Sequence, residues 1–317
     1  MRFVVATHGH CFDGLASAAL FTAFSGRLHA HAAYEYRACG YGVSQQHAEP
    51  SLFTGDENAI LDYRFVPCAA LTWYFDHHGT AFADAQARSY FEDARKTRRF
   101  YFDPEATSCT RFIADVAERD FGLRFDALGE LVEWADKVDS ARFDSAAHAT
   151  DQSNPLLRLA AVVEHYGDDR FLKRFVPRLL DAPVRSLAES EDVSRKFAPL
   201  GRRQQRFAER VREKAEERGR VVFVDLTDAV STTLGKFVTY ALFPRAVYSV
   251  VVGLLTSGIK ISIGYNPWCG QPRDRDIGNL CARYGGGGHP VVGGISLGRE
   301  ALERGRRIAA DVAEQLA

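Results

Sequence analysis

The sequence predicts an α/β protein, with a doubly wound, mainly parallel sheet in its N-terminal part and a smaller C-terminal α/β domain. In the first half of the chain, short apolar runs alternate with glycine-containing turns and helix-compatible segments, which is typical of strand–helix–strand units. After a long charged stretch the composition changes to β-branched runs, which indicates a second sheet. A chain of 317 residues has room for two domains, and we place them at 1–195 and 196–317.

Four strands are expected in the N-terminal domain. The β-prone run at 3–6 leads through a turn into an alanine-rich, helix-compatible segment at 15–21. Residues 29–36 alternate as a second strand does, and 58–63 forms a third. The apolar run at 71–75 is typical of a fourth strand, buried on both faces of a parallel sheet.

Acids and histidines stand at the ends of three of these strands. His8 and Asp13 follow the first strand, Asp62 ends the third, and an Asp-His-His run at 76–78 ends the fourth. A lone acid at a strand end is usually a cap or turn residue. Three such ends in one domain favour a functional site, because functional side chains collect at the carboxyl edge of open α/β sheets.

Helices are expected at 103–120, 128–138 and, punctuated by prolines, at 151–185. The second of these closes with two further carboxylates, Asp136 and Asp139.

The C-terminal domain is expected to contain strands at 221–226, 248–255 and 259–263, a helix at about 234–242 and an amphipathic C-terminal helix. Four consecutive glycines precede His289. Without Cβ atoms, such a backbone approaches an anion closely and turns N–H groups toward it. The alternative is a flexible loop, but the histidine that follows favours anion binding.

Composition excludes several classes of function. Hydrophobic residues make up 46% of the chain, which is typical of globular proteins. The net charge is −1, so there is no overall positive electrostatic field to attract long nucleic acid. The charged segment at 187–218 contains an arginine-rich stretch, but interleaved glutamates favour a solvated connecting helix over a nucleic-acid arm. The six cysteines include no CxxC pair, which fits reduced thiols. Neither a signal peptide nor a membrane span is recognisable, so we expect a cytoplasmic protein.

Aspartates and histidines that converge at strand ends are ligands suited to Mn²⁺, Mg²⁺ or Zn²⁺. Two such ions about 3.5–4 Å apart can clamp a phosphoryl group for attack by water. The ordered set of strand-end motifs, with the later glycine–histidine motif, resembles the DHH phosphoesterase superfamily. More narrowly it is similar to the DHH–DHHA1 branch, which includes nanoRNases, cyclic-dinucleotide phosphodiesterases and RecJ exonucleases. The resemblance covers nearly the whole chain.

The resemblance implies roles for the strand-end residues. His8 and Asp13 would be metal ligands, and Asp62 the acid that bridges two ions. The resemblance also implies one later carboxylate ligand. It is left open between Asp136 and Asp139, with a slight preference for Asp136.

Within the Asp-His-His run, the resemblance implies that His77 binds metal and His78 faces the scissile phosphate. Asp76 would orient the pair as a supporting acid. One departure from the family pattern is Cys11, which stands where many members have an aspartate. Because a thiolate is a softer ligand than a carboxylate, we expect Cys11 to alter the metal preference.

In the second domain, the resemblance implies a substrate-binding motif made of Gly286, Gly287, Gly288 and His289. Arg283 and Asn266 are expected helpers. Trp268 is expected either to stack on a base or to pack in the core or its rim.

The function so implied is a phosphoesterase with two Mn²⁺ ions, or Mg²⁺, Co²⁺ or Zn²⁺ in their place, acting on a short oligonucleotide or small nucleotide. Near-neutral charge argues against a processive nuclease on long polymers or duplexes. The alternatives are an exopolyphosphatase-like hydrolase and a non-catalytic nucleotide sensor with a degraded metal site. A homodimer is left open.

Overall fold

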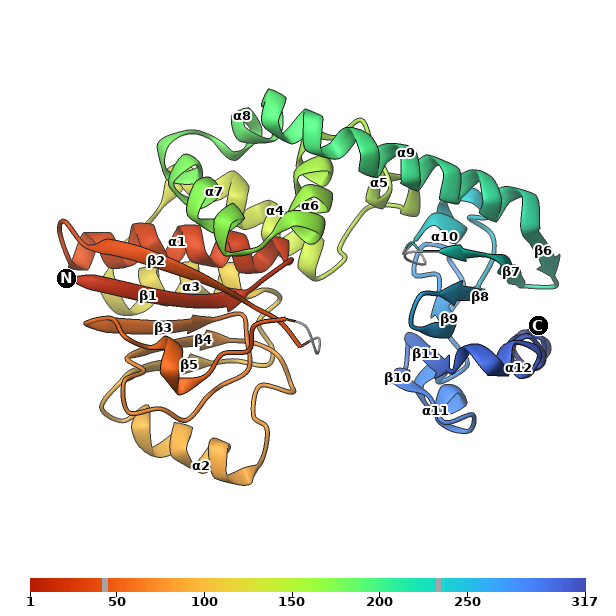
Figure 1. Ribbon diagram of the computed structural model, residues 1–317, viewed down its shortest axis with the longest axis horizontal. Coiled ribbons are helices and arrows are strands. Elements are labelled where there is room, and N and C mark those ends of the chain that lie inside the picture. The colour runs from red at the N-terminus through yellow and green to blue at the C-terminus, as the bar shows by residue number, and fades with distance from the viewer. Residues whose placement is uncertain (42–44, 232–234, 236) are drawn as a thin grey trace. The chain divides into compact units, whose positions relative to one another are not determined.

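The protein is described by a computed structural model that covers residues 1–41, 45–231, 235 and 237–317. The chain forms two compact units (Figure 1). The first comprises 1–142 and 152–198, and the second comprises 143–151 and 199–317. The segment 143–151, which the sequence assigned to the first domain, therefore groups with the second unit.

A five-stranded parallel sheet forms the centre of the first unit, in the order β2-β1-β3-β4-β5. Its strands are β1 (Arg2–His8), β2 (Ala33–Cys39), β3 (Glu57–Leu61), β4 (Trp73–Asp76) and β5 (Arg99–Phe102). Helices of this unit are α1 (Phe12–Leu28), α2 (Ala85–Ala94), α3 (Cys109–Phe121), α4 (Gly129–Asp139), α6 (Pro155–Tyr166), α7 (Asp169–Asp181) and α8 (Val184–Ala188). Short 3₁₀ turns are at Pro50–Leu52 and Asp126–Leu128.

Both faces of this sheet are covered, and the alternation of β4 shows why. Trp73 packs edge-to-face on Phe21 of α1, with ring centroids 5.4 Å apart. Tyr74, on the opposite face, packs on Phe91 of α2 at 5.8 Å. Each buried aromatic side chain of this size contributes roughly 2–3 kcal/mol through the apolar area it removes from water. The predicted doubly wound sheet is confirmed.

The long helix α9 (Glu191–Lys214) leads from the first unit into the second. The second unit has a mixed six-stranded sheet, in the order β10-β11-β9-β8-β7-β6. Its strands are β6 (Ala215–Arg218), β7 (Val221–Ser231), β8 (Tyr248–Leu255), β9 (Gly258–Tyr265), β10 (Gly287–His289) and β11 (Val292–Leu297). Its helices are α5 (Ala146–Ala149), α10 (Val238–Leu242), α11 (Ile277–Ala282) and α12 (Leu302–Leu316), with a 3₁₀ turn at Arg299–Ala301.

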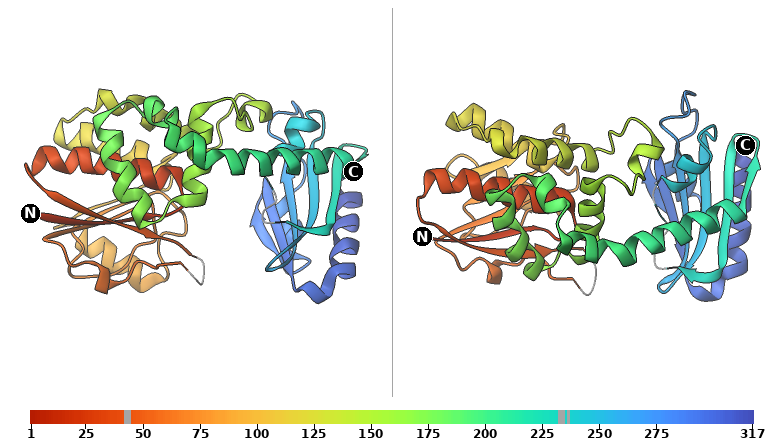
Figure 2. Two further views of the ribbon diagram at one scale, coloured as in Figure 1. Left: turned by 45° about the horizontal axis from the view of Figure 1, so that its top comes forward. Right: turned by 90° about the horizontal axis from the view of Figure 1, so that it is seen from above.

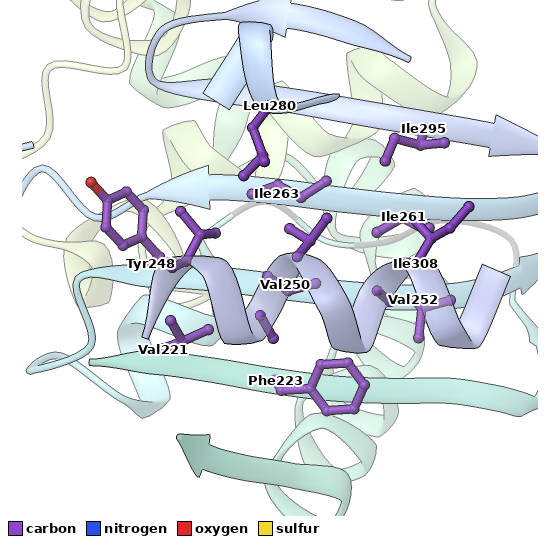
Figure 3. Packing of buried hydrophobic residues seen from close by; sticks show 14 of the residues in the cluster. Val221, Phe223, Tyr248, Val250, Val252, Ile261, Ile263, Leu280, Ile295 and Ile308 are labelled. Atoms are coloured by element: carbon purple, nitrogen blue, oxygen red, sulfur yellow. The ribbon is translucent and has the colours of Figure 1, made fainter. Parts of the chain in front are cut away.

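The core of the second unit lies between the sheet and α12, which runs along one face (Figure 2). Alternate residues of β8 and β9, such as Val250 and Ile261, pack with Ile308 of α12 (Figure 3). On the other face, Val222 and Val224 pack with Val211 of α9. The predicted C-terminal α/β domain is thereby confirmed.

Several elements differ from the sequence-based expectation. The end of the charged segment is not helical, because Ala215–Arg218 pairs antiparallel with β7 as an edge strand. The glycine run is not wholly a loop, since Gly287–His289 pairs with β11. α3 begins at Cys109 instead of 103, because Ser108 caps it by accepting from Arg111 N. The helix expected from 234 begins at Val238, and its expected first residue lies outside the described part. Every helix among the described residues is too short or too polar to span a bilayer.

Candidate metal centre and active site

The predicted ligands of the first unit meet at one edge of its sheet. β3 lies between β1 and β4, and all three run parallel. His8 is the last residue of β1, Asp62 follows β3, and Asp76 ends β4 directly before His77 and His78. The carboxyl ends of three neighbouring strands thus carry His8, Asp62 and the Asp-His-His run.

Asp62 lies at the centre of this cluster and is only 1% exposed. Its carboxylate is 3.6 Å from His8 Nδ1, 3.6 Å from His77 Nε2 and 3.8 Å from His78 Nδ1. Burial by itself would raise the pKa of this carboxyl, but the neighbouring histidines outweigh burial and lower the pKa to about 2. Asp62 is therefore a buried anion surrounded by imidazoles.

The backbone of Asp62 is left-handed, with φ of 55°. Aspartate is among the few non-glycine residues that adopt this conformation at low cost. Its N–H donates to the Phe75 carbonyl at 2.9 Å, which ties the end of β3 to β4.

His77 contacts a second set of acids. Its Nε2 is 3.4 Å from Asp139, 3.6 Å from Asp62 and 4.0 Å from Asp13. Nδ1 lies 3.0 Å from the Ala106 carbonyl, to which it donates, so Nε2 is the ring atom left for a ligand. Burial lowers the pKa of His77, but the surrounding carboxylates outweigh burial and raise the pKa to about 9. The surroundings of Nε2 therefore favour a positive charge.

Asp13 is held by the first turn of α3. Its carboxylate accepts from Cys109 N at 2.7 Å, from Thr110 N at 3.0 Å and from the Thr110 hydroxyl. A helix N-terminus stabilises a carboxylate through its free N–H groups and its dipole. Burial, followed by the charge of Asp62, nevertheless raises the pKa of Asp13 well above its usual value.

Asp76 orients His78. The Tyr74 hydroxyl donates to one carboxylate oxygen at 3.0 Å, and His78 Nδ1 donates to the other at 2.7 Å. This second hydrogen bond raises the pKa of His78. The imidazole is more than a third exposed, and its Nε2 is the atom left for a substrate. Asp76 contacts His78 as a supporting acid would.

Asp139 joins the cluster, whereas Asp136 does not. Asp139 is close to His77, but Asp136 accepts hydrogen bonds from Thr107 and Arg142. The geometry thus runs against the slight preference for Asp136. Three residues along a helix correspond to about 4.5 Å of axial rise, so the two carboxylates meet different neighbours although both are near the end of α4.

Cys11 lies with His8 and Asp62, with one ligand atom of each within 4.8 Å of the others. Burial, followed by the charges of Asp62 and Asp13, raises the pKa of the thiol well above its usual value. The thiol therefore binds a metal only if the metal displaces its proton.

These side chains fit divalent cations. Three groups within 4.8 Å share members: His8, Cys11 and Asp62; Asp62, His77 and His78; Asp13, His77 and Asp139. Within the described residues, both oxygens of Asp62 and Nε2 of His77 are buried without a hydrogen-bond partner. An uncompensated buried charge costs several kcal/mol, so a shared cation is the natural partner of this set. Oxygen, nitrogen and sulfur donors together suit Mn²⁺, Fe²⁺ or Zn²⁺.

The supporting residues were not found by sequence reasoning. Tyr74 had a usable signal, because residues two apart in a strand share a face and Asp76 follows it by two. Thr110 and Ala106 had none, since their contacts with Asp13 and His77 depend on how α3 packs.

In the second unit, Asn266 is not placed to bind substrate. Asn266 is fully buried and donates to the carbonyls of Pro244 and Ala246, at 3.1 and 2.8 Å. Its oxygen accepts from Trp268 N at 3.1 Å. Trp268 Nε1 in turn donates to the Phe143 carbonyl at 2.7 Å, which ties the segment 143–151 to this unit. Both side chains have structural roles.

The glycine–histidine motif is exposed. Gly287, Gly288 and His289 form the edge strand β10, and Arg283, just after α11, is also exposed. Gly288 has φ of 152°, and a Cβ there would overlap the Val292 carbonyl. Lys260 of β9, which the sequence did not single out, extends over Gly294 of β11. A glycine-rich edge with cations nearby is a surface on which an anion can approach the backbone.

The fold of the chain is similar to that of solved DHH-domain proteins. The pGpG-specific phosphodiesterase PggH of Vibrio cholerae is 19% identical, with a TM-score of 0.69 over 100% of this chain and 99% of that chain. The DHH domain of a protein from a family of ribosomal proteins is 12% identical, with a TM-score of 0.61 over 99% of this chain and 87% of that chain. RecJ of Thermus thermophilus in complex with Mg²⁺ is 13% identical, with a TM-score of 0.54 over 100% of this chain and 50% of that chain.

No family model and no curated protein matches the chain. At these identities the comparisons concern the fold. The chain has the DHH–DHHA1 fold, and the resemblance seen in the sequence is confirmed at that level.

Proposed function

We propose that this chain is a divalent-metal-dependent phosphoesterase that hydrolyses ester bonds of small nucleotides or short oligonucleotides. The observation that carries the proposal is the buried carboxylate of Asp62, whose two oxygens lack hydrogen bonds while His8, His77 and His78 surround it. A buried anion shared between two groups of nitrogen and oxygen donors is what a pair of bridged cations requires.

The residues of the first unit divide the work. His8, Cys11, Asp13, Asp62, His77 and Asp139 would hold the ions. Two such ions supply Lewis acidity toward the phosphoryl oxygens and a nucleophilic water at neutral pH. His78 would donate from Nε2 to the phosphate, because Asp76 engages Nδ1. Its raised pKa favours the charged imidazolium, which stabilises negative charge as it develops.

A small nucleotide is the substrate class that the molecule best supports. The net charge of −1 disfavours a long polyanion, which needs an extended basic surface. The similarity to a pGpG-specific phosphodiesterase over the whole chain makes a linear dinucleotide the first candidate. In the second unit, exposed Arg283, His289 and the backbone of β10 would bind a nucleotide phosphate.

Hydrolysis of a substrate panel with the ion-stripped protein and added Mn²⁺ tests the proposal. The panel contains pGpG, a cyclic dinucleotide, 3′-phosphoadenosine-5′-phosphate and polyphosphate, and we expect pGpG to turn over fastest. Asp62→Asn, which keeps the size of the side chain but removes its charge, should lower turnover by at least about a hundredfold.

The matched control is Asp93→Asn, an exposed carboxylate of α2 that pairs with Lys96, which should leave turnover unchanged. Equal turnover by Asp62→Asn and the unmodified protein would falsify the proposal. Nucleotide binding without turnover of any substrate would instead favour a sensor.

A further inference from the structure

We propose that a second nucleotide-binding subsite lies beside α7, where Arg170 and Lys196 bind a backbone phosphate of a short oligonucleotide. This rests on the proposed function, because it extends that substrate away from the metal cluster. The subsite belongs entirely to the first unit.

A cavity of about 230 Å³ lies at the start of α7. Cationic and aromatic side chains line it, among them Tyr166, Arg170, Arg174 and Lys196. The Lys196 ammonium lies 4.9 Å from the centre of the Tyr166 ring, and this cation–π contact holds it at the cavity. An aromatic ring beside ammonium and guanidinium groups is the combination that binds a base and its phosphate.

Asp168 also lines this cavity, and both it and the nearby Asp192 are engaged by other groups of the protein. Asp168 caps α7 by accepting from Phe171 N at 2.8 Å. Asp192 pairs with Arg174 at 3.1 Å and with Arg178 at 3.4 Å. Within the described residues, neither Arg170 nor Lys196 forms an ion pair with an acid, and the Lys196 ammonium lies over the Tyr166 ring. Two cations therefore remain available for an anion.

A second cavity, of about 310 Å³, adjoins the first and extends to the loop between β1 and α1, which contains His10. The two cavities share Asp168 and Arg170, and the larger one is also lined by His10. His10 stands in the chain between His8 and Cys11, two candidate ligands. Its N–H donates to the Gly167 carbonyl at 3.0 Å, just before α7.

This hydrogen bond fixes the loop between β1 and α1 against the turn at Gly167, beside both cavities. His10 Nδ1 makes a second contact there, with the Glu164 carbonyl at 3.2 Å. A Cβ on Gly167 would approach His10 N to 2.8 Å, so glycine permits this close packing. An oligonucleotide with one ester at the metal cluster would place its neighbouring nucleotides along the cavities toward Lys196.

Binding of a labelled five-nucleotide RNA, followed by fluorescence anisotropy in EDTA, tests the subsite without hydrolysis. The variant is Arg170→Gln with Lys196→Gln. The matched control is Lys173→Gln, an exposed cation on α7 that does not line the cavity. We expect the double variant to raise Kd roughly tenfold or more. We also expect the slope of log Kd against log salt to fall by about 0.7, because one phosphate contact is lost.

Lys173→Gln should bind as the unmodified protein does. The subsite is disproved if the double variant keeps the original Kd and slope, if Lys173→Gln weakens binding as much, or if the unmodified protein does not bind the RNA. Hydrolysis of bis(p-nitrophenyl) phosphate by the unmodified protein with Mn²⁺ reports on the proposed function separately, because so small a diester does not need the cavities.

Discussion

At the scale of single residues, Asp136 and Asp139 form a matched pair on one turn of α4. Asp139→Asn should lower Mn²⁺ affinity about ten- to a hundredfold, because its carboxylate lies 3.4 Å from His77 within the ligand cluster. Asp136→Asn should leave the Mn²⁺ affinity unchanged and lower only the stability, by about 1–3 kcal/mol, since it weakens contacts with Thr107 and Arg142. Equilibrium dialysis and thermal unfolding measure the two effects. If Asp136→Asn lowered the Mn²⁺ affinity and Asp139→Asn did not, Asp136 would be the ligand instead.

We expect Cys11 to determine which ion the candidate metal site prefers. We expect the unmodified protein to prefer a softer ion such as Zn²⁺ or Fe²⁺, and Cys11→Asp to shift the preference toward Mn²⁺ and Mg²⁺ by about tenfold. The physical reason is that a carboxylate is a harder donor than a thiolate. Competition dialysis of the ion-stripped protein against mixtures of two metal ions measures the ratio of their affinities. An identical ratio for both proteins, with equal activity for every ion, would show that the thiol does not bind metal.

At the scale of elements, β10 contains two glycines that differ in whether a side chain would fit. Gly288→Ala would force a side chain into a glycine-only backbone region and against the Val292 carbonyl, at a cost of about 1–3 kcal/mol. A Cβ on Gly287 meets no atom within 4 Å. We therefore expect Gly288→Ala to raise KM for a dinucleotide several-fold without changing the Mn²⁺ affinity, and Gly287→Ala to change KM less. Steady-state kinetics with dialysis of Mn²⁺ separates these effects, and equal KM values for the two variants would contradict the role of the strand.

The elements that sequence could predict are those whose signal is local. Buried parallel strands such as β4 are apolar in sequence, and the acids at the ends of β3 and β4 are visible there. β6 was not predicted because it is an exposed edge strand. Its charged residues are as typical of a solvated helix as of a strand. The position of Asp139 beside His77 and the burial of Asn266 depend on contacts between distant segments. No local pattern encodes such contacts.

At the scale of the whole molecule, the candidate metal ligands and the glycine–histidine motif belong to different units. All candidate ligands, from His8 to Asp139, belong to the first unit, whereas β10 and Arg283 belong to the second. Ion binding in the first unit and nucleotide binding at the glycine–histidine motif are therefore separable by measurement. Mn²⁺ at a hundred times its Kd should stabilise the protein by about 2.7 kcal/mol for each ion bound, because the folded state alone assembles the cluster.

This stabilisation should depend on pH, because the ions displace protons from the cluster. The pKa of Asp139 is about 6, raised first by burial and then by Asp62, so its proton competes with an ion below that pH. His77, with a pKa of about 9, keeps its proton through neutral pH and must release it when an ion binds. Between about pH 5.5 and 7.5 we expect Mn²⁺ affinity to rise about tenfold per pH unit for each proton released. Calorimetric titrations in two buffers of different ionisation enthalpy count these protons. A pH-independent affinity with no proton release would show that Mn²⁺ binds away from Asp139 and His77.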